Sequence, residues 1–268
     1  MADPRTLDII NTTPRFTAAD AARLNERFAD ADAATVLAQV MAEGLVGRLA
    51  VVSSFGAESA VLLHLVSTID PSVPVLFLET GKHFAETLAY RDALAARLGL
   101  RALQNLLPNA SDISTRDAAG ERWSYDPDGC CDLRKVRPLA RALAGFDATI
   151  TGRKGFQAST RAALARFEID KSDAAGRLKI NPLATWSKAD LDGYFSANGL
   201  PRHPLEAQGY PSIGCAPCTS PVAAGETPRA GRWRGWDKVE CGIHIASEQA
   251  GGEQAGDEQA GGEQAPAA

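Results

Sequence analysis

The sequence predicts an α/β fold in which a mostly parallel, twisted sheet carries helices on both faces. Short apolar runs typical of buried strands alternate with amphipathic stretches of helical length, which is the pattern of βαβ crossovers. Loops rich in serine, glycine and basic residues follow several of these runs. In a parallel sheet such loops meet at the carboxyl ends of the strands, where ligands bind.

The first predicted strand covers residues 48–53 and leads directly into a helix predicted over 60–67. Between them lie the small residues Ser53, Ser54 and Gly56. Small residues let backbone N–H groups approach a ligand, and the helix N-terminus favours a negative group there. This loop is a candidate phosphate or nucleotide cradle, although serine and glycine are also ordinary turn residues.

The same pattern recurs along the chain. A strand at 73–78, a polar loop ending at His83 and a helix over 84–98 precede a third strand at 100–106. His83 is either a ligand contact or a helix-capping residue. Residues 108–129 are polar and predict irregular structure.

The remaining predicted elements complete this fold. Helices over 17–29 and 33–43 form a cover without chemistry, and a later helix begins at the cap Ser187. Further strands are predicted at 147–150 and 178–183.

The loop after the strand at 147–150 gathers glycine, hydroxyl and cationic side chains. It contains Gly152, Arg153 and Arg161. This composition suits a phosphate, and a solvated basic loop is the alternative.

Composition limits the classes of function. The chain has 268 residues, 45% hydrophobic and 23% charged, with a net charge of -5. This mix is typical of a globular protein, and it gives no bulk attraction to nucleic acid. No apolar run approaches the roughly 20 residues that span a bilayer, and no secretory signal is evident. We therefore expect a cytoplasmic protein with no nucleic-acid or membrane partner.

A single domain over 1–246 is expected to precede a disordered low-complexity tail over 247–268.

Four of the five cysteines form two close pairs, Cys130 with Cys131 and Cys215 with Cys218. Adjacent cysteines cannot close an ordinary disulfide without strain. A lone Cys-x-x-Cys is either a redox dithiol or half a zinc site. Two pairs supply four thiolates, which zinc or an iron–sulfur cluster would use, although a contiguous pair is unusual among zinc ribbons.

The fifth cysteine, Cys241, is left without a partner. Lys238 and His244 flank it, and three arginines precede it: Arg229, Arg232 and Arg234. Positive charge favours the thiolate, which is the form that attacks an electrophile. We predict that Cys241 is a nucleophile toward an anionic sulfur substrate.

Six ordered stretches together resemble one known family. They are Ser-Ser-Phe-Gly-Ala-Glu at 53–58, Leu-Glu-Thr-Gly at 78–81, Cys-Cys-Asp-Leu-Arg-Lys at 130–135, Thr-Gly-Arg-Lys at 151–154, Gly-Cys-Ala-Pro-Cys-Thr at 214–219 and Glu-Cys-Gly-Ile-His at 240–244. Over roughly residues 20–245 the chain resembles the assimilatory adenylyl-sulfate reductases of the adenylyl-sulfate and phosphoadenylyl-sulfate reductase family. The resemblance implies an adenine nucleotide α-hydrolase-like fold.

The resemblance also implies a reaction. In sulfate assimilation and cysteine biosynthesis, adenosine 5'-phosphosulfate would be reduced to sulfite and AMP through an S-sulfocysteine on Cys241. Thioredoxin or a similar dithiol would then release the sulfite, and a mobile catalytic segment at about 220–246 would carry Cys241 to it.

Residue roles follow from the same resemblance. A [4Fe-4S] cluster would be held by Cys130, Cys131, Cys215 and Cys218. The residues about the phosphosulfate would be Lys135, Arg229, Arg232 and His244. The loops that bind the adenosine would include Ser53, Ser54, Gly56, Leu78, Gly152, Arg153 and Arg161.

Three other functions compete with this one. A reductase could prefer 3'-phosphoadenosine 5'-phosphosulfate. An ATP-pyrophosphatase-type sulfurtransferase would want a glycine-richer loop at 54–59. A non-catalytic iron–sulfur redox sensor would leave Cys241 and the nucleotide loops without a role. The residues leave open whether the chain forms a homo-oligomer.

Overall fold

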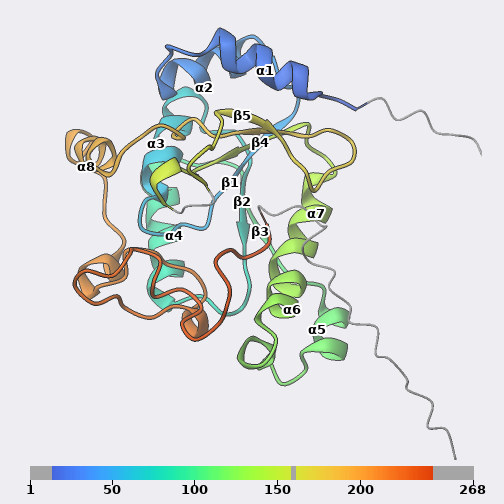
Figure 1. Ribbon diagram of the computed structural model, residues 1–268, viewed down its shortest axis with the longest axis vertical. Coiled ribbons are helices and arrows are strands. Elements are labelled where there is room, and N and C mark those ends of the chain that lie inside the picture. The colour runs from blue at the N-terminus through green and yellow to red at the C-terminus, as the bar shows by residue number, and fades with distance from the viewer. Residues whose placement is uncertain (1–13, 158–160, 244–268) are drawn as a thin grey trace, which may run out of the picture.

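A six-stranded sheet lies at the centre of the computed structural model, which describes residues 14–157 and 161–243 (Figure 1). The strand order is β3-β2-β1-β4-β6-β5. The strands are β1 (Leu49–Val52), β2 (Val75–Leu78), β3 (Leu103–Leu106), β4 (Ala148–Thr151), β5 (Phe167–Ile169) and β6 (Leu178–Ile180). Neighbouring strands run parallel, except that β5 is antiparallel to β6. The prediction of a mostly parallel sheet is confirmed. The predicted tail at 247–268 and His244 lie outside the described residues.

Helices pack on both faces of the sheet (Figure 1). They are α1 (Ala18–Arg27), α2 (Ala33–Ala42), α3 (Ser59–Ile69), α4 (Ala85–Leu98), α5 (Ala110–Arg116), α6 (Pro127–Cys131), α7 (Arg137–Leu143) and α8 (Lys188–Ala197). Short helical turns are η1 (Arg122–Ser124), η3 (Gly155–Gln157), η5 (Pro204–Gln208) and η6 (Ala216–Cys218), and η2 (Asp132–Val136) is a π-helix. No helix in the described part of the chain is both long and apolar enough to cross a membrane.

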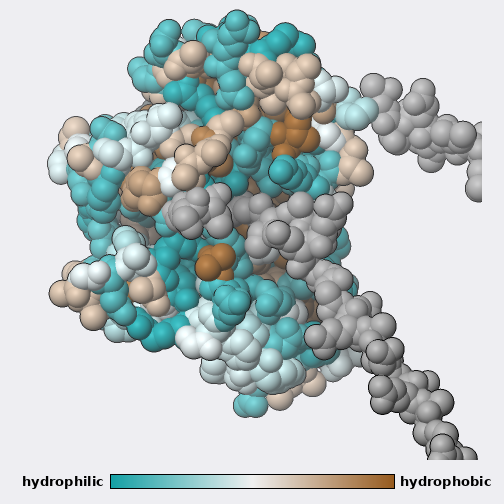
Figure 2. All heavy atoms as spheres, viewed as in Figure 1, coloured by the Kyte–Doolittle hydropathy of each residue, from teal (hydrophilic) through white to brown (hydrophobic). Residues whose placement is uncertain are grey.

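The apolar runs in the sequence are explained by burial on both faces. Val51 of β1 belongs to the larger core cluster, together with side chains of α2 and α3. Its neighbour Ala50 points to the other face, where it packs with Leu139 and Leu143 of α7. Because successive strand residues point to opposite faces, a strand covered on both sides needs a continuous apolar run. The face shown in Figure 2 is accordingly mostly hydrophilic, with isolated apolar patches.

Two elements differ from the sequence predictions. Residues 108–129 were expected to be irregular, but they contain α5, whose cap Asn109 accepts hydrogen bonds from Ser111 and Asp112. None of the α5 side chains is buried, so no apolar periodicity signals the helix. The antiparallel strand β5 has only three residues, which is too short for a recognisable pattern.

Candidate active site

A cavity of about 410 Å³ lies at the carboxyl ends of β1, β2 and β4. One side is formed by the strand-end wall (residues 53–59 and 151–157), and the opposite side includes the C-terminal segment (residues 220–243). The predicted substrate-binding residues all line it: Ser53, Ser54, Gly56, Leu78, Gly152, Arg153 and Arg161. So do the described members of the predicted catalytic set, which are Lys135, Arg229, Arg232 and Cys241.

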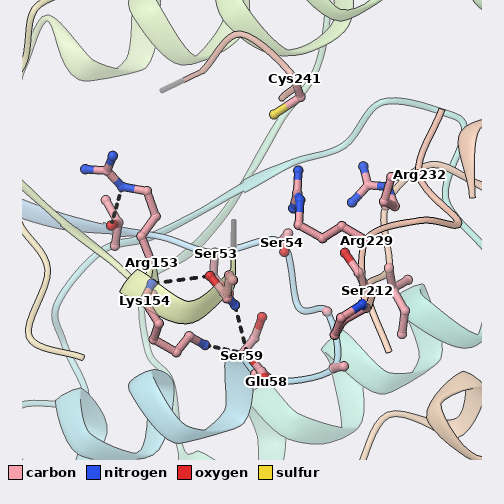
Figure 3. A pocket seen from close by; sticks show the side chains of 18 of the residues that line it. Ser53, Ser54, Glu58, Ser59, Arg153, Lys154, Ser212, Arg229, Arg232 and Cys241 are labelled. Carbon is pink, nitrogen blue, oxygen red and sulfur yellow. Dashed lines mark hydrogen bonds and ion pairs between the residues drawn. The ribbon is translucent and has the colours of Figure 1, made fainter. Parts of the chain in front are cut away.

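Figure 3 shows how these side chains face one another across the cavity. The half-buried Cys241 lies across from Glu58 and Ser59. Arg153 and Lys154 stand on one flank, and Arg229 and Arg232 stand on the other. The sheet and the C-terminal segment therefore bring a thiol and several cations to one space.

The loop after β1 is held in an unusual backbone conformation. Phe55 has φ +48°, and its fully buried ring packs edge-on against Phe77 with the ring centres 5.6 Å apart. The Phe55 N–H donates to the Ser53 hydroxyl at 3.2 Å. A non-glycine residue with positive φ is uncommon and clusters at functional sites. The turn directs the start of α3 toward the cavity, where a helix N-terminus favours an anion.

Most cations of the cavity already have carboxylate partners. Lys154 Nζ lies 2.7 Å from Glu58 Oε2, and Arg153 pairs with Glu168. Glu240, the residue before Cys241, pairs with Arg161 at 2.7 Å and with Arg229 at 3.1 Å.

Two cations that line the cavity are different. Lys135 and Arg232 make no ion pair with any residue that the structure describes. Arg232 lies against Gly214 and over the Trp233 ring at 4.4 Å, and its buried Nε has no partner among the described residues. Burial lowers the pKa of Lys135, but the nearby sulfurs of Cys215 and Cys241 outweigh this and raise it. A positive charge that has no carboxylate partner in the described part of the chain therefore stands near the sulfur of Cys241.

Two of the basic residues that lie close to Cys241 in the sequence do not contribute to the cavity. Arg234 turns away and pairs with Glu226 at 2.9 Å, and it does not line the cavity. Lys238 pairs with the exposed Asp128. Of the flanking basic residues, Arg229 and Arg232 contribute to the cavity and these two do not.

The other four cysteines line a second, much smaller cavity. Its wall contains Cys130, Cys131, Cys215 and Cys218, with Lys135 shared between the two cavities. Burial raises the pKa of Cys130, Cys131 and Cys218 to about 11. Burial also raises the pKa of Cys215, but Lys135 and the Thr80 hydroxyl outweigh it and lower the net value.

The donor set of this second cavity consists of four cysteine sulfurs. No group of three or more His, Cys, Asp or Glu side chains within 14–157 and 161–243 is placed to hold one metal ion. A cubane cluster takes one thiolate on each iron, so its ligands surround a volume and need not meet at a point. Four free thiols around one cavity have that arrangement.

A π-helical turn positions Lys135 between the two cavities. The sequence predicts one continuous helix from Cys130 to about Leu143, but Asp132–Val136 forms a π-helix between α6 and α7. Pro138 lacks an N–H, and its ring would clash with the Arg134 carbonyl in a regular α-helix. A wider turn relieves this clash, and such turns are frequent at functional sites.

Comparison with known proteins places the chain in a family. Residues 48–221 match the family model of the phosphoadenosine phosphosulfate reductase domain. The chain belongs to this family. An adenosine 5'-phosphosulfate reductase of Mesorhizobium japonicum is 48% identical over 246 residues, which cover 92% of this chain and 95% of the relative. A phosphoadenosine 5'-phosphosulfate reductase of Gloeobacter violaceus is 44% identical over 74% of this chain and 82% of the relative. The family resemblance found in the sequence is confirmed.

A solved structure of the same family has a similar fold. The phosphoadenylyl-sulfate reductase of Candida auris, in a phosphate complex, has a TM-score of 0.64 and 25% identity, and the match covers 77% of this chain and 98% of that one. An FMN adenylyltransferase of Candida glabrata, with a TM-score of 0.50 and 13% identity, shares the fold alone. These neighbours agree with the predicted nucleotide-binding α/β architecture.

Sequence reasoning did not assign the two carboxylates that hold the cavity's cations. Glu58 accepts from Lys154 and Gln157, and Glu240 binds two arginines. An acidic residue beside a predicted anion site offers no local signal, because its partners other than Arg229 are 79 to 99 residues away in the chain.

Proposed function

We propose that this chain reduces adenosine 5'-phosphosulfate to sulfite and AMP. The observation that carries the proposal is the placement of Cys241, which faces a nucleotide-sized cavity. Beside it are two cations, Lys135 and Arg232, that have no carboxylate partner within 14–157 and 161–243. The names of relatives such as the Mesorhizobium japonicum reductase support the same substrate.

The substrate would span the cavity from the strand-end wall to the C-terminal segment. Ser53, Ser54 and Gly56 form a cradle at the start of α3, and Gly152 and Leu78 add small or apolar surface for the adenosine. The phosphosulfate would then extend toward Lys135 and Arg232. An anionic nucleophile meets repulsion from an anionic sulfate, so cations are needed where charge develops in the transition state.

The chemical steps balance within this site. The Cys241 thiolate forms a bond to the sulfate sulfur, while the bond from that sulfur to the phosphate oxygen breaks and AMP leaves with the electron pair. A thiolate of an external dithiol protein then attacks Cys241 Sγ of the S-sulfocysteine, which releases sulfite. The second thiol of the donor resolves the mixed disulfide and returns the Cys241 thiolate. The donor is oxidised to a disulfide, and the sulfur gains two electrons.

The four-cysteine cavity would hold a [4Fe-4S] cluster through Cys130, Cys131, Cys215 and Cys218. When bound, the cluster would supply structural support and electrostatic charge beside Lys135, and no electrons, because the external dithiol already provides two. Thioredoxin or a similar protein fits the donor role. All five cysteines are free thiols, which fits a reducing cytoplasm.

The second candidate substrate is 3'-phosphoadenosine 5'-phosphosulfate, because the Gloeobacter violaceus relative carries that name. An additional phosphate would need additional positive charge. On the strand-end flank, Arg153 and Lys154 are already paired with Glu168 and Glu58. This pairing favours the substrate without the 3'-phosphate, and competition kinetics with both nucleotides would test the preference.

The decisive experiment omits the reductant. Incubation with adenosine 5'-phosphosulfate should add one sulfonate group to the wild-type chain, and peptide mass mapping should locate it on Cys241. A Cys241→Ser variant that keeps its fold is the control and should gain none. Absence of the adduct from wild type, or its appearance on another cysteine, would refute the proposal and favour a redox sensor or a sulfurtransferase.

A further inference from the structure

Glu240 is a buried carboxylate immediately before the proposed nucleophile. It is 8% exposed. Its Oε1 accepts from Nε and Nη2 of Arg161 at 3.0 and 2.7 Å, and its Oε2 accepts from Nη2 of Arg229 at 3.1 Å. Arg229 Nη2 also donates to the backbone carbonyl of Val239 at 2.5 Å. Both oxygens of the carboxylate are therefore bound, and they are bound by different parts of the chain.

The Arg161 side of this contact continues into the strand-end wall. Arg161 Nη1 donates to Gln157 Oε1 at 2.7 Å, and Gln157 Nε2 donates to Glu58 Oε2 at 2.8 Å. Glu58 also accepts from the buried Lys154. A chain of side-chain hydrogen bonds thus connects the loop at the start of α3 with the residue that precedes Cys241.

The C-terminal segment has few other attachments near Cys241. Residues 220–243 are all described, and they form no helix and no strand apart from one isolated bridge between Thr219 and Arg232. Lys238, whose side chain is 5% exposed, pairs with Asp128, whose side chain is 78% exposed, so solvent screens this pair more than the pairs of Glu240. Ile243 adds partly buried apolar contact. The buried ion pairs of Glu240 are the polar attachment adjacent to the nucleophile.

Charge pairing separates the cations of the cavity into two groups. Arg161 and Arg229 share the single negative charge of Glu240, whereas Lys135 and Arg232 have no ion pair among the described residues. Only the second group keeps its full attraction for an anionic ligand. The first group is already engaged in holding the C-terminal segment.

We propose that Glu240 is a positioning residue, which fixes Cys241 over the cavity through its ion pairs with Arg161 and Arg229. The two arginines act mainly on the segment and only secondarily on the nucleotide. The rate of attack depends on this placement, because displacing a reacting atom by about 1 Å can cost roughly 100-fold in rate. The catalytic part of this inference rests on the proposed function, whereas the placement of Cys241 can be tested without substrate.

The first test measures access to Cys241 in the full chain. Iodoacetamide should alkylate Cys241 faster in Glu240→Gln than in wild type, as followed by peptide mass mapping. Plateau rates at alkaline pH, where the thiol is fully ionised, isolate access from ionisation. We expect an increase of at least about tenfold, equivalent to about 1.4 kcal/mol. The matched control is Glu226→Gln, which removes a carboxylate of the same segment whose ion-pair partner among the described residues is the exposed Arg234. An unchanged plateau rate in Glu240→Gln, or an equal increase in the control, would overturn the proposal.

The second test separates positioning from nucleotide binding. In single turnovers with adenosine 5'-phosphosulfate, Glu240→Gln should slow the limiting rate of adduct formation about tenfold, while the dissociation constant of AMP changes by less than about twofold. Glu240→Asp keeps the charge but shortens the side chain and should give an intermediate rate. Tighter AMP binding without a slower adduct step would mean that Glu240 merely competes for nucleotide-binding arginines, which contradicts the proposal. If wild type forms no adduct, the proposed function fails, and the alkylation comparison still decides the role of Glu240.

Discussion

The two sides of the cavity are built in different ways. The strand-end wall follows directly from β1 and β4, and its loops are fixed by buried side chains such as Phe55 and Thr151. The C-terminal segment contains no helix, and the attachments nearest to Cys241 are the ion pairs of Glu240. One side therefore inherits the stability of the hydrophobic core, and the other depends on a few polar contacts.

This difference matches the two demands of the proposed reaction. Nucleotide binding benefits from a rigid surface, because preorganised groups lose little entropy on binding. The nucleophile must meet the nucleotide first and a dithiol protein afterwards. A segment held by a few contacts can open without unfolding the sheet, since local opening costs less than global unfolding. We infer that the nucleophile lies on the side that can be released.

The largest expected effect comes from making the same substitution in the two groups of cysteines. Cys241→Ser should abolish adduct formation, a loss of at least about 10⁴-fold, because a serine hydroxyl stays protonated at neutral pH. Its iron content and unfolding temperature should match wild type. Cys215→Ser should instead lose most of the iron and unfold at a lower temperature, because a metal bound only in the folded state stabilises that state. Iron analysis and thermal unfolding of both variants check this. Loss of iron from Cys241→Ser would contradict the assignment of separate roles to Cys241 and to the four-cysteine cavity.

Lys135 should show the next largest effect, because it lines both cavities. Lys135→Met removes a cation that has no ion-pair partner among the described residues. We expect adduct formation to slow about 100-fold to 1,000-fold, which is the usual range for removal of one transition-state electrostatic contact. Lys135→Arg keeps the charge and should recover part of the rate. Equal rates in the two variants would show that shape, and not charge, is what matters at this position.

A carboxylate of the strand-end wall should instead affect global stability. Glu58 is the ion-pair partner of Lys154, whose side chain is 3% exposed. Burial lowers the pKa of Lys154, and Glu58 opposes this shift. Glu58→Gln leaves a buried cation uncompensated, so the free energy of unfolding should fall by about 3 kcal/mol. The control Glu43→Gln breaks an ion pair with Arg27 in which both side chains are 43% exposed. Its free energy of unfolding, measured with denaturant, should fall by at most about 1 kcal/mol. Equal losses of unfolding free energy in the two variants would contradict the expectation that the buried pair contributes more to stability than the exposed pair.

The same difference explains what could be predicted from the sequence. The strands and their loops were predictable because burial on both faces leaves continuous apolar runs, and loops at strand ends are fixed by topology. The contacts of the C-terminal segment were not predictable. The pairing of Glu240 with Arg161 joins residues 79 positions apart, and no periodicity signals it. Arg234 was expected near Cys241 because it is close in sequence, yet its side chain pairs with Glu226.

The smallest expected effect comes from comparing alanine substitutions at Gly242 and Gly225. The comparison tests whether backbone strain alone slows the reaction or whether the placement of Cys241 must also change. Gly242 has φ +86°, and an added Cβ would lie 3.2 Å from Val136 Cγ2. Gly225 has nearly the same φ, +87°, but an added Cβ would have no atom within 4 Å. A left-handed conformation costs a non-glycine residue roughly 1–2 kcal/mol, so both alanine variants carry similar strain. Only Gly242→Ala also pushes residue 242, the neighbour of Cys241, against Val136, so single-turnover adduct formation should slow about tenfold in this variant alone, while the two variants should have similar unfolding temperatures. If Gly225→Ala slowed the reaction equally, strain anywhere in the segment would suffice, and the position of Cys241 would not be set locally.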